Sequence, residues 1–289
     1  RPDSRGVVVA QNRILEKIFL RDAGLATAPF APVTSEMELE SAWAAVGSPA
    51  LLKTARLGYD GKGQAAAGSL DEARRAWKAF GGKPCVLEKR VPLDVELSVV
   101  LARGADGACA AFPAAENRHQ YGILDVTIVP ADVPGALARE AEDAAKRIAE
   151  KLDYVGVLAV EFFVSDGKLL VNEIAPRPHN SGHYTLDACA TSQFEQQVRA
   201  LCGLPLGDCR LLTPAVMVNL LGDLWPEGGQ PAWEAVLANP GAKLHLYGKA
   251  AARPGRKMGH FTVLGADRDR ALEDALRIQG ALRGALQNT

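Results

Sequence analysis

Residues 171–183 read VNEIAPRPHNSGH, and this stretch decides the fold that the rest of the chain is expected to adopt. The apolar run 169–171 leads into the carboxylate of Glu173. Two prolines then stiffen a segment that carries Arg177 and two histidines. A strand that delivers an acid, followed by a rigid polar loop, favours a site for a metal ion and an anion over a packed core.

A second acidic strand is predicted just upstream, over 157–164, and contains Glu161. Residues 165–168, Ser-Asp-Gly-Lys, link the two strands and predict a hairpin turn, because Asp-Gly between two apolar runs is a strong hairpin signal. The alternative for this pair of strands is an exposed hairpin with two solvated acids.

The length of the turn decides whether the two carboxylates meet. A two-residue loop at 166–167 would pair Glu161 with Asn172 and place Glu161 and Glu173 on opposite faces. A three-residue loop at 166–168 would place Glu161 directly across from Glu173. Two adjacent carboxylates repel, so a shared cation is expected, and Mg2+ carrying a nucleotide phosphate is the oxygen-liganded choice. We therefore predict a loop of odd length and a metal site at Glu161 and Glu173.

The composition is that of a globular protein with room for two domains or one large one. The 289 residues are 48% hydrophobic and 23% charged, which allows a full core. The net charge of −1 gives no overall field that favours nucleic acid or an anionic membrane, so an anion site must come from locally clustered Lys and Arg. No apolar run approaches the roughly 20 residues of a membrane span.

The first residues show no signal-peptide pattern, which favours a cytoplasmic protein. The five cysteines lack CxxC spacing, so free thiols in a reducing cytosol are expected. The five histidines form no HExxH motif, and a zinc site is not predicted.

Residues 11–23 are predicted as a helix, on which Arg13 and Lys17 lie one turn apart. The simplest interpretation of this pair is a solvated face. The apolar face of the helix carries Ile14, Leu15, Ile18 and Phe19. Ser35 and Glu38 have the spacing of a capping box that opens the next helix.

Two neighbouring segments indicate a phosphate site. Residues 50–55 are expected as a short buried strand, in which Lys53 is unusual unless an anion meets it. Residues 58–64 carry three glycines and Lys62, which allows backbone N–H groups to approach a phosphate closely. A plain hairpin loop is the alternative for 58–64.

A strand, a capped helix over 69–80, a strand over 84–91, a linker and a long strand over 95–102 describe a small α+β unit hinged to a larger sheet. The hinge carries Glu88 and backbone amides, and would suit adenine, which needs one donor and one acceptor. Residues 116–120 are expected as a polar loop.

Helices are expected over 134–152 and 192–202, the second with Phe194, Val198 and Leu201 facing inward. From Thr213 the chain becomes rich in short strands, at 215–220 and 244–249, and it ends in a helix over 267–287.

Between these strands and the final helix lies a basic turn, 253–260. With Lys249, the residues Arg253, Arg256 and Lys257 would suit a phosphate monoester, and a solvated hairpin tip is the alternative.

Four segments together resemble the ATP-grasp superfamily and, within it, the family of N5-carboxyaminoimidazole ribonucleotide synthases. They are GYDGKGQ at 58–64, ENRHQYGI at 116–123, VNEIAPRPHNSGH at 171–183 and RPGRKMGH at 253–260. The resemblance implies an α+β ATP-grasp fold, in which a small α+β lid subdomain lies over a larger mixed or antiparallel sheet and a small C-terminal β-rich subdomain follows.

The same resemblance implies a division of the chain. Its parts would be a linker and helix that follow a missing N-terminal Rossmann-like domain (1–27), the lid subdomain (28–91), the large subdomain with the metal site (92–212), and the C-terminal β-rich subdomain with the final helix (213–289).

The resemblance also implies a role for each matching residue. ATP would be held by Arg13, Lys53, Gly58, Tyr59, Asp60, Gly61, Lys62, Gly63, Gln64, Glu88, Lys89, Arg90, Val91, Glu96, His119, Asn172 and Glu173. Bicarbonate and the ribonucleotide would be surrounded by Arg177, His179, Asn180, Lys249, Arg256 and Lys257. Mg2+ would be bound by Glu161 and Glu173. The groups nearest the reacting atoms would be Arg177, Lys249, Tyr59 and Asp60.

The implied activity is the ATP- and bicarbonate-dependent carboxylation of 5-aminoimidazole ribonucleotide through carboxyphosphate, with Mg2+, in a cytoplasmic homodimer that uses only small-molecule substrates. One alternative is another ATP-grasp ligase with a phosphorylated acceptor. The other is a nucleotide-binding fragment that is inactive without an N-terminal domain.

Overall fold

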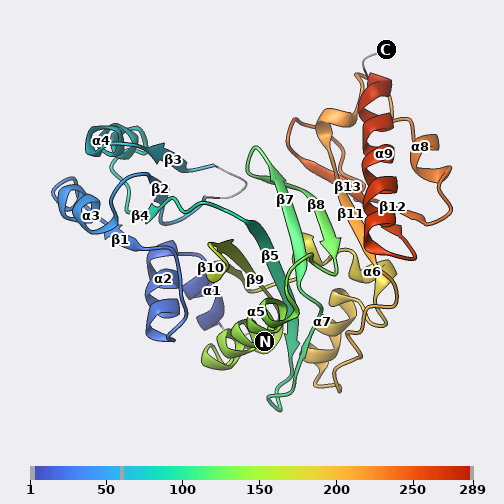
Figure 1. Cartoon of the computed structure of the whole chain (residues 1–289), viewed down its shortest axis with the longest axis horizontal. Helices are drawn as coiled ribbons and strands as arrows, with labels where there is room; N and C mark the ends of the chain where they lie inside the picture. Colours follow the sequence, from blue (N-terminus) through green and yellow to red (C-terminus); the bar gives the residue numbers. More distant parts are fainter. Residues whose placement is uncertain (1–3, 59–61, 287–289) are drawn as a thin grey trace.

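Two antiparallel sheets form the framework of the molecule, seen in a computed structural model that describes residues 4–58 and 62–286 (Figure 1). The small sheet has the strand order β1-β4-β2-β3. Its strands are β1 Phe30–Val33, β2 Ala50–Thr54, β3 Gln64–Ala67 and β4 Cys85–Lys89. The large sheet has nine strands in the order β10-β9-β5-β7-β8-β11-β13-β12, with β6 beside β5. Its strands are β5 Val95–Arg103, β6 Cys109–Ala111, β7 Ala115–Gln120, β8 Ile123–Val129, β9 Gly156–Ser165, β10 Lys168–Ala175, β11 Ala215–Leu221, β12 Ala242–Leu246 and β13 Lys257–Leu264.

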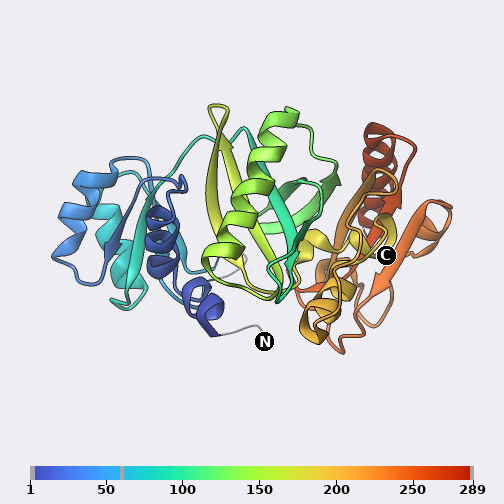
Figure 2. The same cartoon turned by 90° about the horizontal axis from the view of Figure 1, so that it is seen from below.

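Helices cover both sheets, and one of them joins the two. The small sheet carries α3 and α4, whereas α5, α7 and α9 pack on the large one, and α2 contacts both β4 and β10. Figure 2 shows the small sheet at one end of the molecule and α9 at the other. The helices are α1 Ser4–Ala10, α2 Arg13–Asp22, α3 Glu38–Val46, α4 Leu70–Ala79, α5 Gly135–Lys151, α6 Thr185–Ala188, α7 Gln193–Cys202, α8 Glu234–Leu237 and α9 Arg268–Leu286, with short 3-10 turns at Asn180–Gly182 and Gly222–Leu224.

Side-chain caps explain where several helices begin. Ser69 accepts a hydrogen bond from the Glu72 amide and starts α4, which confirms the predicted capped helix. The capping box predicted at Ser35 and Glu38 forms only in part. Glu38 Oε2 accepts from the Ser35 amide at 3.3 Å, but α3 begins at Glu38 itself, and its N-cap residue makes no side-chain bond.

The central strand β5 is buried on both faces, which explains its continuous apolar run. Leu97, Val99 and Leu101 pack against α5, while Val100 and Ala102 belong to a second core cluster on the opposite face. Because side chains alternate along a strand, Glu96 and Ser98 share the face of Val100 and Ala102. Strand β5 therefore carries the polar side chains of Glu96 and Ser98 near its beginning and buried apolar residues further along.

Two amphipathic assignments from the sequence are wrong. The buried face of α2 carries Glu16, Lys17 and Leu20, so Lys17 is not on a solvated face, and Leu15 is exposed. In α7 the predicted inward residues Phe194, Val198 and Leu201 are exposed. The residues buried in their place are Gln193, Gln196 and Ala200. Both helices bury polar side chains because neighbouring backbone groups need those side chains as hydrogen-bond partners.

The expected polar loop at 116–120 is also wrong, because these residues form β7 between β5 and β8. Asn117 faces Thr127 across the pair, and their side chains form a 2.9 Å hydrogen bond. An unbroken run of polar residues here forms a strand, and its His119 lines the large cleft.

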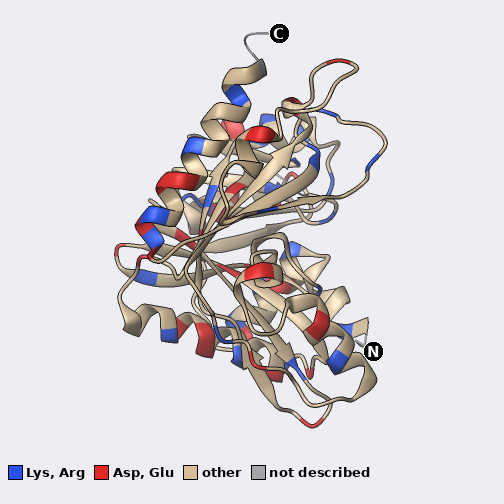
Figure 3. Ribbon diagram, turned by 90° about the vertical axis from the view of Figure 1, so that its right-hand side faces the viewer, with Lys and Arg blue, Asp and Glu red and all other residues tan. Residues whose placement is uncertain are grey.

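The C-terminal strands extend the large sheet. Strand β11 pairs with β8 on one side and β13 on the other, and α9 packs on β11 and β13. Acidic and basic residues alternate along α9 (Figure 3), for example in the 2.8 Å pair of Arg277 with Asp274. The division of the chain into subdomains stays a prediction. Among the described residues, no helix has the length and apolarity needed to cross a membrane.

The hairpin between β9 and β10 closes with a two-residue loop. Ser165 pairs with Lys168, and the central residues Asp166 and Gly167 have φ of 50° and 71°. Positive φ at both central residues is what a type I′ turn requires. The predicted hairpin is present, but its loop does not have the predicted odd length.

We expect Gly167→Ala to lower the free energy of unfolding by roughly 1 kcal/mol, because an L side chain is disfavoured at positive φ. Gly280→Ala is the matched control, since Gly280 lies inside α9 and should gain up to about 1 kcal/mol from the change. An added Cβ meets nothing within 4 Å at either position, so only the backbone differs. Urea denaturation measures both, and equal effects would contradict the turn assignment.

Candidate active site

A β-bulge at Asn172 brings the two predicted metal-binding carboxylates together. Val171 pairs with Phe162, but the next pair is Glu173 with Glu161, so Asn172 is the extra residue. A bulge shifts the register by one and therefore reverses which residues share a face. The prediction that a two-residue loop would separate Glu161 from Glu173 was wrong, because the bulge supplies the shift that the turn does not.

The bulge is held by two buried ionisable side chains from α2. Lys17 Nζ donates to the carbonyls of Asn172 at 2.9 Å and Val171 at 3.4 Å, and Glu16 Oε1 accepts from the Ile174 amide at 2.6 Å. Backbone groups that leave a strand ladder must find other partners, because a buried unsatisfied group costs about 1–3 kcal/mol. Glu16 and Lys17 meet this requirement, and the sequence reasoning missed both.

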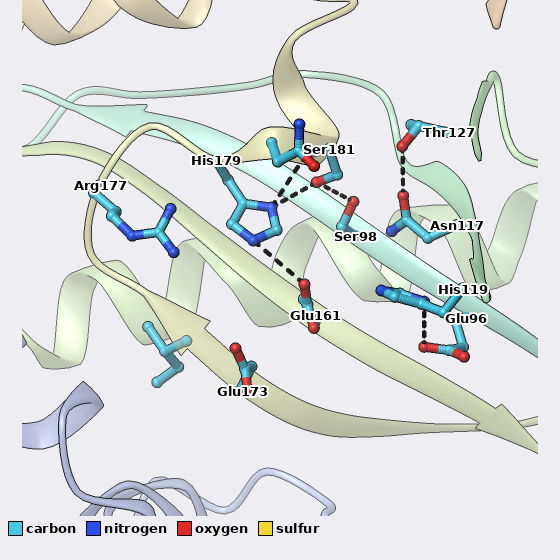
Figure 4. Close-up of polar contacts among 12 residues, drawn as sticks. Glu96, Ser98, Asn117, His119, Thr127, Glu161, Glu173, Arg177, His179 and Ser181 are labelled. Atoms are coloured by element: carbon cyan, nitrogen blue, oxygen red, sulfur yellow. Dashed lines mark hydrogen bonds and ion pairs between the residues drawn. The ribbon is translucent and has the colours of Figure 1, made fainter. Parts of the chain in front are cut away.

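Glu161 and Glu173 lie on the neighbouring strands β9 and β10 (Figure 4), and a nitrogen-bearing side chain lies close to each carboxylate. Glu173 Oε2 lies 3.0 Å from the Arg13 guanidinium, and Glu161 Oε1 lies 3.3 Å from His179 Nε2. Burial, and then the charge of Glu173, raises the pKa of Glu161 to about 7. A positive charge bound between the two carboxylates would therefore relieve their mutual repulsion.

His179 meets Glu161 as a neutral imidazole. Burial, and then the charge of Arg177, lowers the pKa of His179 to about 3. The His179 Nδ1 atom accepts from the Ser181 amide at 3.3 Å, so its Nε2–H is the donor to Glu161. Ser98 on β5 donates to Ser181 Oγ at 2.8 Å and completes the chain of contacts in Figure 4.

A buried ion pair lies under the predicted phosphate residues. Lys53 Nζ lies 2.8 Å from Glu88 Oε2, and Lys17 Nζ lies 3.8 Å from Glu88 Oε1. Burial raises the pKa of Glu88, but the charges of Lys17 and Lys53 outweigh it, so the pKa is lowered overall. The Glu88 side chain is committed to these lysines, and its backbone lies between Phe30 of β1 and Leu51 of β2 in the small sheet.

The predicted hinge 88–91 uses some of its amides internally. The Lys89 amide donates to the Pro29 carbonyl at 2.8 Å, and the Arg90 amide donates to the Pro49 carbonyl at 2.9 Å. An adenine clamp would therefore have to use other backbone groups of this segment.

The described end of the glycine-rich segment lies beside Lys53, because Gln64 pairs with Lys53 in the small sheet. Gly63 has φ of 71°, and a Cβ there would lie 2.5 Å from Thr54 Oγ1, so only glycine fits. Gly58 and Gln64 line the same cleft as Lys53. Tyr59, Asp60 and Gly61 lie outside the described residues.

On the opposite wall, His119 on β7 pairs with Glu96 on β5 at 3.0 Å. Burial lowers the pKa of His119, but the hydrogen bond and charge of Glu96 outweigh it and raise the pKa overall.

Elsewhere in the cleft, Asn180 exchanges two amide hydrogen bonds with Asn219, of 3.0 and 2.7 Å.

One cleft of about 900 Å³ collects most of the predicted residues. Those that line it are Arg13, Lys53, Gly58, Gln64, Glu96, His119, Glu161, Asn172, Glu173, Arg177, His179, Asn180, Lys249 and Lys257. Arg256 is not among the lining residues and donates to the Ala251 carbonyl at 2.8 Å. His183, which lies in the polar stretch 171–183 but was given no individual role, also lines the cleft. Tyr247 lines it too, and no pattern in the sequence indicated a role for that residue.

The chain is an ATP-grasp protein. A family model described as the ATP-grasp domain matches residues 18–194, and one described as the phosphoribosylaminoimidazole carboxylase C-terminal domain matches 215–274. The predicted α+β ATP-grasp fold with a C-terminal domain is thereby confirmed.

Its relatives narrow the class further. The chain is 46% identical over 272 residues to N5-carboxyaminoimidazole ribonucleotide synthase of Bacillus subtilis, covering 93% of this chain and 70% of the relative. It superimposes on the synthetase of Thermus thermophilus with a TM-score of 0.89 at 44% identity, covering 97% of this chain and 74% of that one. The Aspergillus clavatus synthase in complex with ADP and 5-aminoimidazole ribonucleotide gives a TM-score of 0.90 at 30% identity, with 98% and 75% covered. This chain belongs to the N5-carboxyaminoimidazole ribonucleotide synthase family.

Glu16 makes the stability of the fold depend on pH. Burial, and then the charge of Glu173, raises the pKa of Glu16 from 4.5 to about 8. Between these values the folded state binds more protons than the unfolded state, so stability falls as the pH rises. We expect Glu16→Gln, which keeps the acceptor for Ile174, to reduce this decline in urea denaturation between pH 5 and pH 8. Glu140→Gln, on the exposed side of α5, should leave the wild-type profile unchanged. A wild-type slope in Glu16→Gln would contradict the assignment.

Proposed function

We propose that this chain binds ATP in the cleft and carboxylates the exocyclic amine of 5-aminoimidazole ribonucleotide, with bicarbonate as the carbon source. The observation that carries the proposal is the bulge that sets Glu161 beside Glu173 in the same cleft as Lys53 and Arg177. The relatives of this chain, which include a complex with ADP and the ribonucleotide, support the choice of substrates.

The residues present fit Mg2+ on chemical grounds. Glu161 and Glu173 offer carboxylate oxygens from paired positions, and Asn172 Oδ1 is buried without a hydrogen-bond partner among the described residues. Carboxylate and amide oxygens suit a hard cation that also holds phosphate. Such an ion would offset the charge of the phosphate oxygens during transfer.

On the nucleotide side, Arg13 and Lys53 would bind phosphate oxygens, with Gly58 and Gln64 beside them in the cleft. Glu96 would accept from the ribose hydroxyls, with His119 holding its carboxylate at 3.0 Å. Glu88 would hold Lys53 in place, because their 2.8 Å pair is buried.

In the reaction, a bicarbonate oxygen attacks the γ-phosphorus of ATP, and the bond to the β-phosphate oxygen breaks, giving carboxyphosphate and ADP. Carboxyphosphate then releases phosphate and CO2, and the amine of the ribonucleotide attacks the carbon to form the carbamate. Arg177 and Lys249 would stabilise the negative charge on the carboxylate under transfer. The family resemblance also assigns Tyr59 and Asp60 to the reacting groups, and both lie outside the described residues.

On the acceptor side, Lys249 and Lys257 would bind the phosphate of the ribonucleotide, with His179 and Asn180 beside its base. A homodimer and a cytoplasmic location remain predictions from the family resemblance.

The activity test measures phosphate release from ATP with bicarbonate, with and without 5-aminoimidazole ribonucleotide. We expect release only when both substrates are present, with the carbamate as product. Release with a different phosphorylated acceptor would favour another ATP-grasp ligase. Binding of ADP without any turnover would favour a nucleotide-binding role and would contradict the proposal.

The metal assignment makes a separate prediction. Glu173→Gln should weaken the binding of ADP in the presence of Mg2+ by about 10- to 100-fold, because a neutral amide replaces a charged oxygen ligand. Isothermal titration calorimetry with and without Mg2+ measures this. Glu195→Gln, which removes an exposed carboxylate of α7, is the control and should bind as the wild type does. Equal affinity for ADP in Glu173→Gln and in Glu195→Gln would contradict the metal assignment.

A further inference from the structure

Gln193, the first residue of α7, is fully buried and its amide can take only one orientation. Its Oε1 accepts from the His179 amide at 2.8 Å, and its Nε2 donates to the His179 carbonyl at 2.7 Å. A backbone N–H can only donate and a carbonyl can only accept, so exchanging the oxygen and nitrogen would break both bonds.

This orientation fixes the tautomer of His183. The second hydrogen of Gln193 Nε2 points to His183 Nδ1 at 3.0 Å. An amide nitrogen has no lone pair to offer, so His183 Nδ1 must be the acceptor, and the neutral ring carries its proton on Nε2. Burial, and then the charge of Lys257, lowers the pKa of His183 to about 4, so the ring is neutral at pH 7.

Neighbouring rings hold the plane of His183. Its centroid lies 5.5 Å from that of Phe194, 5.1 Å from that of His260 and 6.1 Å from that of Tyr247, the last in an edge-on arrangement. Within residues 4–58 and 62–286, the bond from Gln193 is the only hydrogen bond of the His183 ring. The ring lines the large cleft, so a polar group in that cleft can reach its Nε2–H.

Gln193 packs closely against the segment 179–185. A Cβ at Gly182 would lie 2.8 Å from Gln193 Oε1, so a side chain there would displace the amide. The Gln193 backbone amide donates to Thr185 Oγ1 at 3.0 Å, and that hydroxyl donates to the Gly182 carbonyl at 2.6 Å. The segment 179–185 is thus tied to α7 at several points, and the position of His183 follows from them.

We propose that His183 is a specificity-determining residue that donates its Nε2–H to a phosphate oxygen of the acceptor, and that Gln193 is the positioning residue that fixes this donor. The inference rests on the proposed function, because it assigns the acceptor to the part of the cleft lined by Lys249 and Lys257. The two lysines supply charge, which has little directional preference, whereas a neutral N–H in a fixed plane selects an oxygen in one place. A neutral donor also avoids repulsion from the lysines.

The tautomer is tested by two-bond 1H–15N NMR of histidine-labelled protein, with the His183 signals assigned by their loss in His183→Gln. We expect Nε2 to carry the proton in the wild type. In Gln193→Glu, an acceptor oxygen replaces the donor, and His183 should gain a proton on Nδ1. A wild-type proton on Nδ1 would overturn the inference, and this readout does not depend on whether the carboxylation reaction occurs.

The role of the donor is tested by steady-state kinetics and by calorimetric binding of 5-aminoimidazole ribonucleotide. His183→Phe keeps an aromatic ring without a donor and should raise the KM and the Kd for the ribonucleotide about 10- to 100-fold, the usual range for a lost bond to a charged group. His183→Gln keeps an N–H donor near the same place and should stay within about threefold of the wild type. The KM for ATP and the affinity for ADP should be unchanged in both, which also reports correct folding. Wild-type binding by His183→Phe, or equal losses in both variants, would contradict the donor role.

Discussion

The buried contact of the Lys17 ammonium with the carbonyls of Val171 and Asn172 is the interaction on which the site depends. A bulge in a central part of a strand would leave backbone groups without partners, and Lys17 provides donors where the ladder is interrupted. Without the bulge, Glu161 and Glu173 would face opposite sides of the sheet, and the remaining residues of the cleft would surround a single carboxylate. The charge of Lys17 is in turn balanced by Glu88, which also holds Lys53. One buried ammonium therefore links the carboxylate pair to the proposed phosphate side of the cleft.

Local signals in the sequence predicted the elements well. Asp166-Gly167 predicted the hairpin and Ser69 predicted the start of α4, because turn and cap chemistry depends on a few neighbouring residues. The four family motifs also predicted the ATP-grasp fold, which the comparisons confirm. Most of the residues assigned through those motifs line one cleft, although their individual roles stay predictions.

Three of the errors share one physical cause. The bulge at Asn172 has no local signal, since its partners Glu16 and Lys17 lie on a helix far away in the chain. The buried polar residues of α2 and α7 likewise serve as hydrogen-bond partners for backbone groups outside their own helices. The apolar periodicity of each helix does not indicate this. A polar residue among apolar helix positions was the available clue. The role of such a polar residue becomes clear only when the backbone groups to which it hydrogen-bonds are known.

The long separation between Lys17 and Asn172 also has a consequence for how the protein folds. Their contact closes a loop of 155 residues, and non-local contacts of this kind form slowly because the chain must lose much of its freedom before they are made. The β9–β10 hairpin can pair early from local contacts, whereas its final register awaits the docking of α2. We therefore expect the two carboxylates to acquire their common face late in folding, when the small and large sheets have come together around α2.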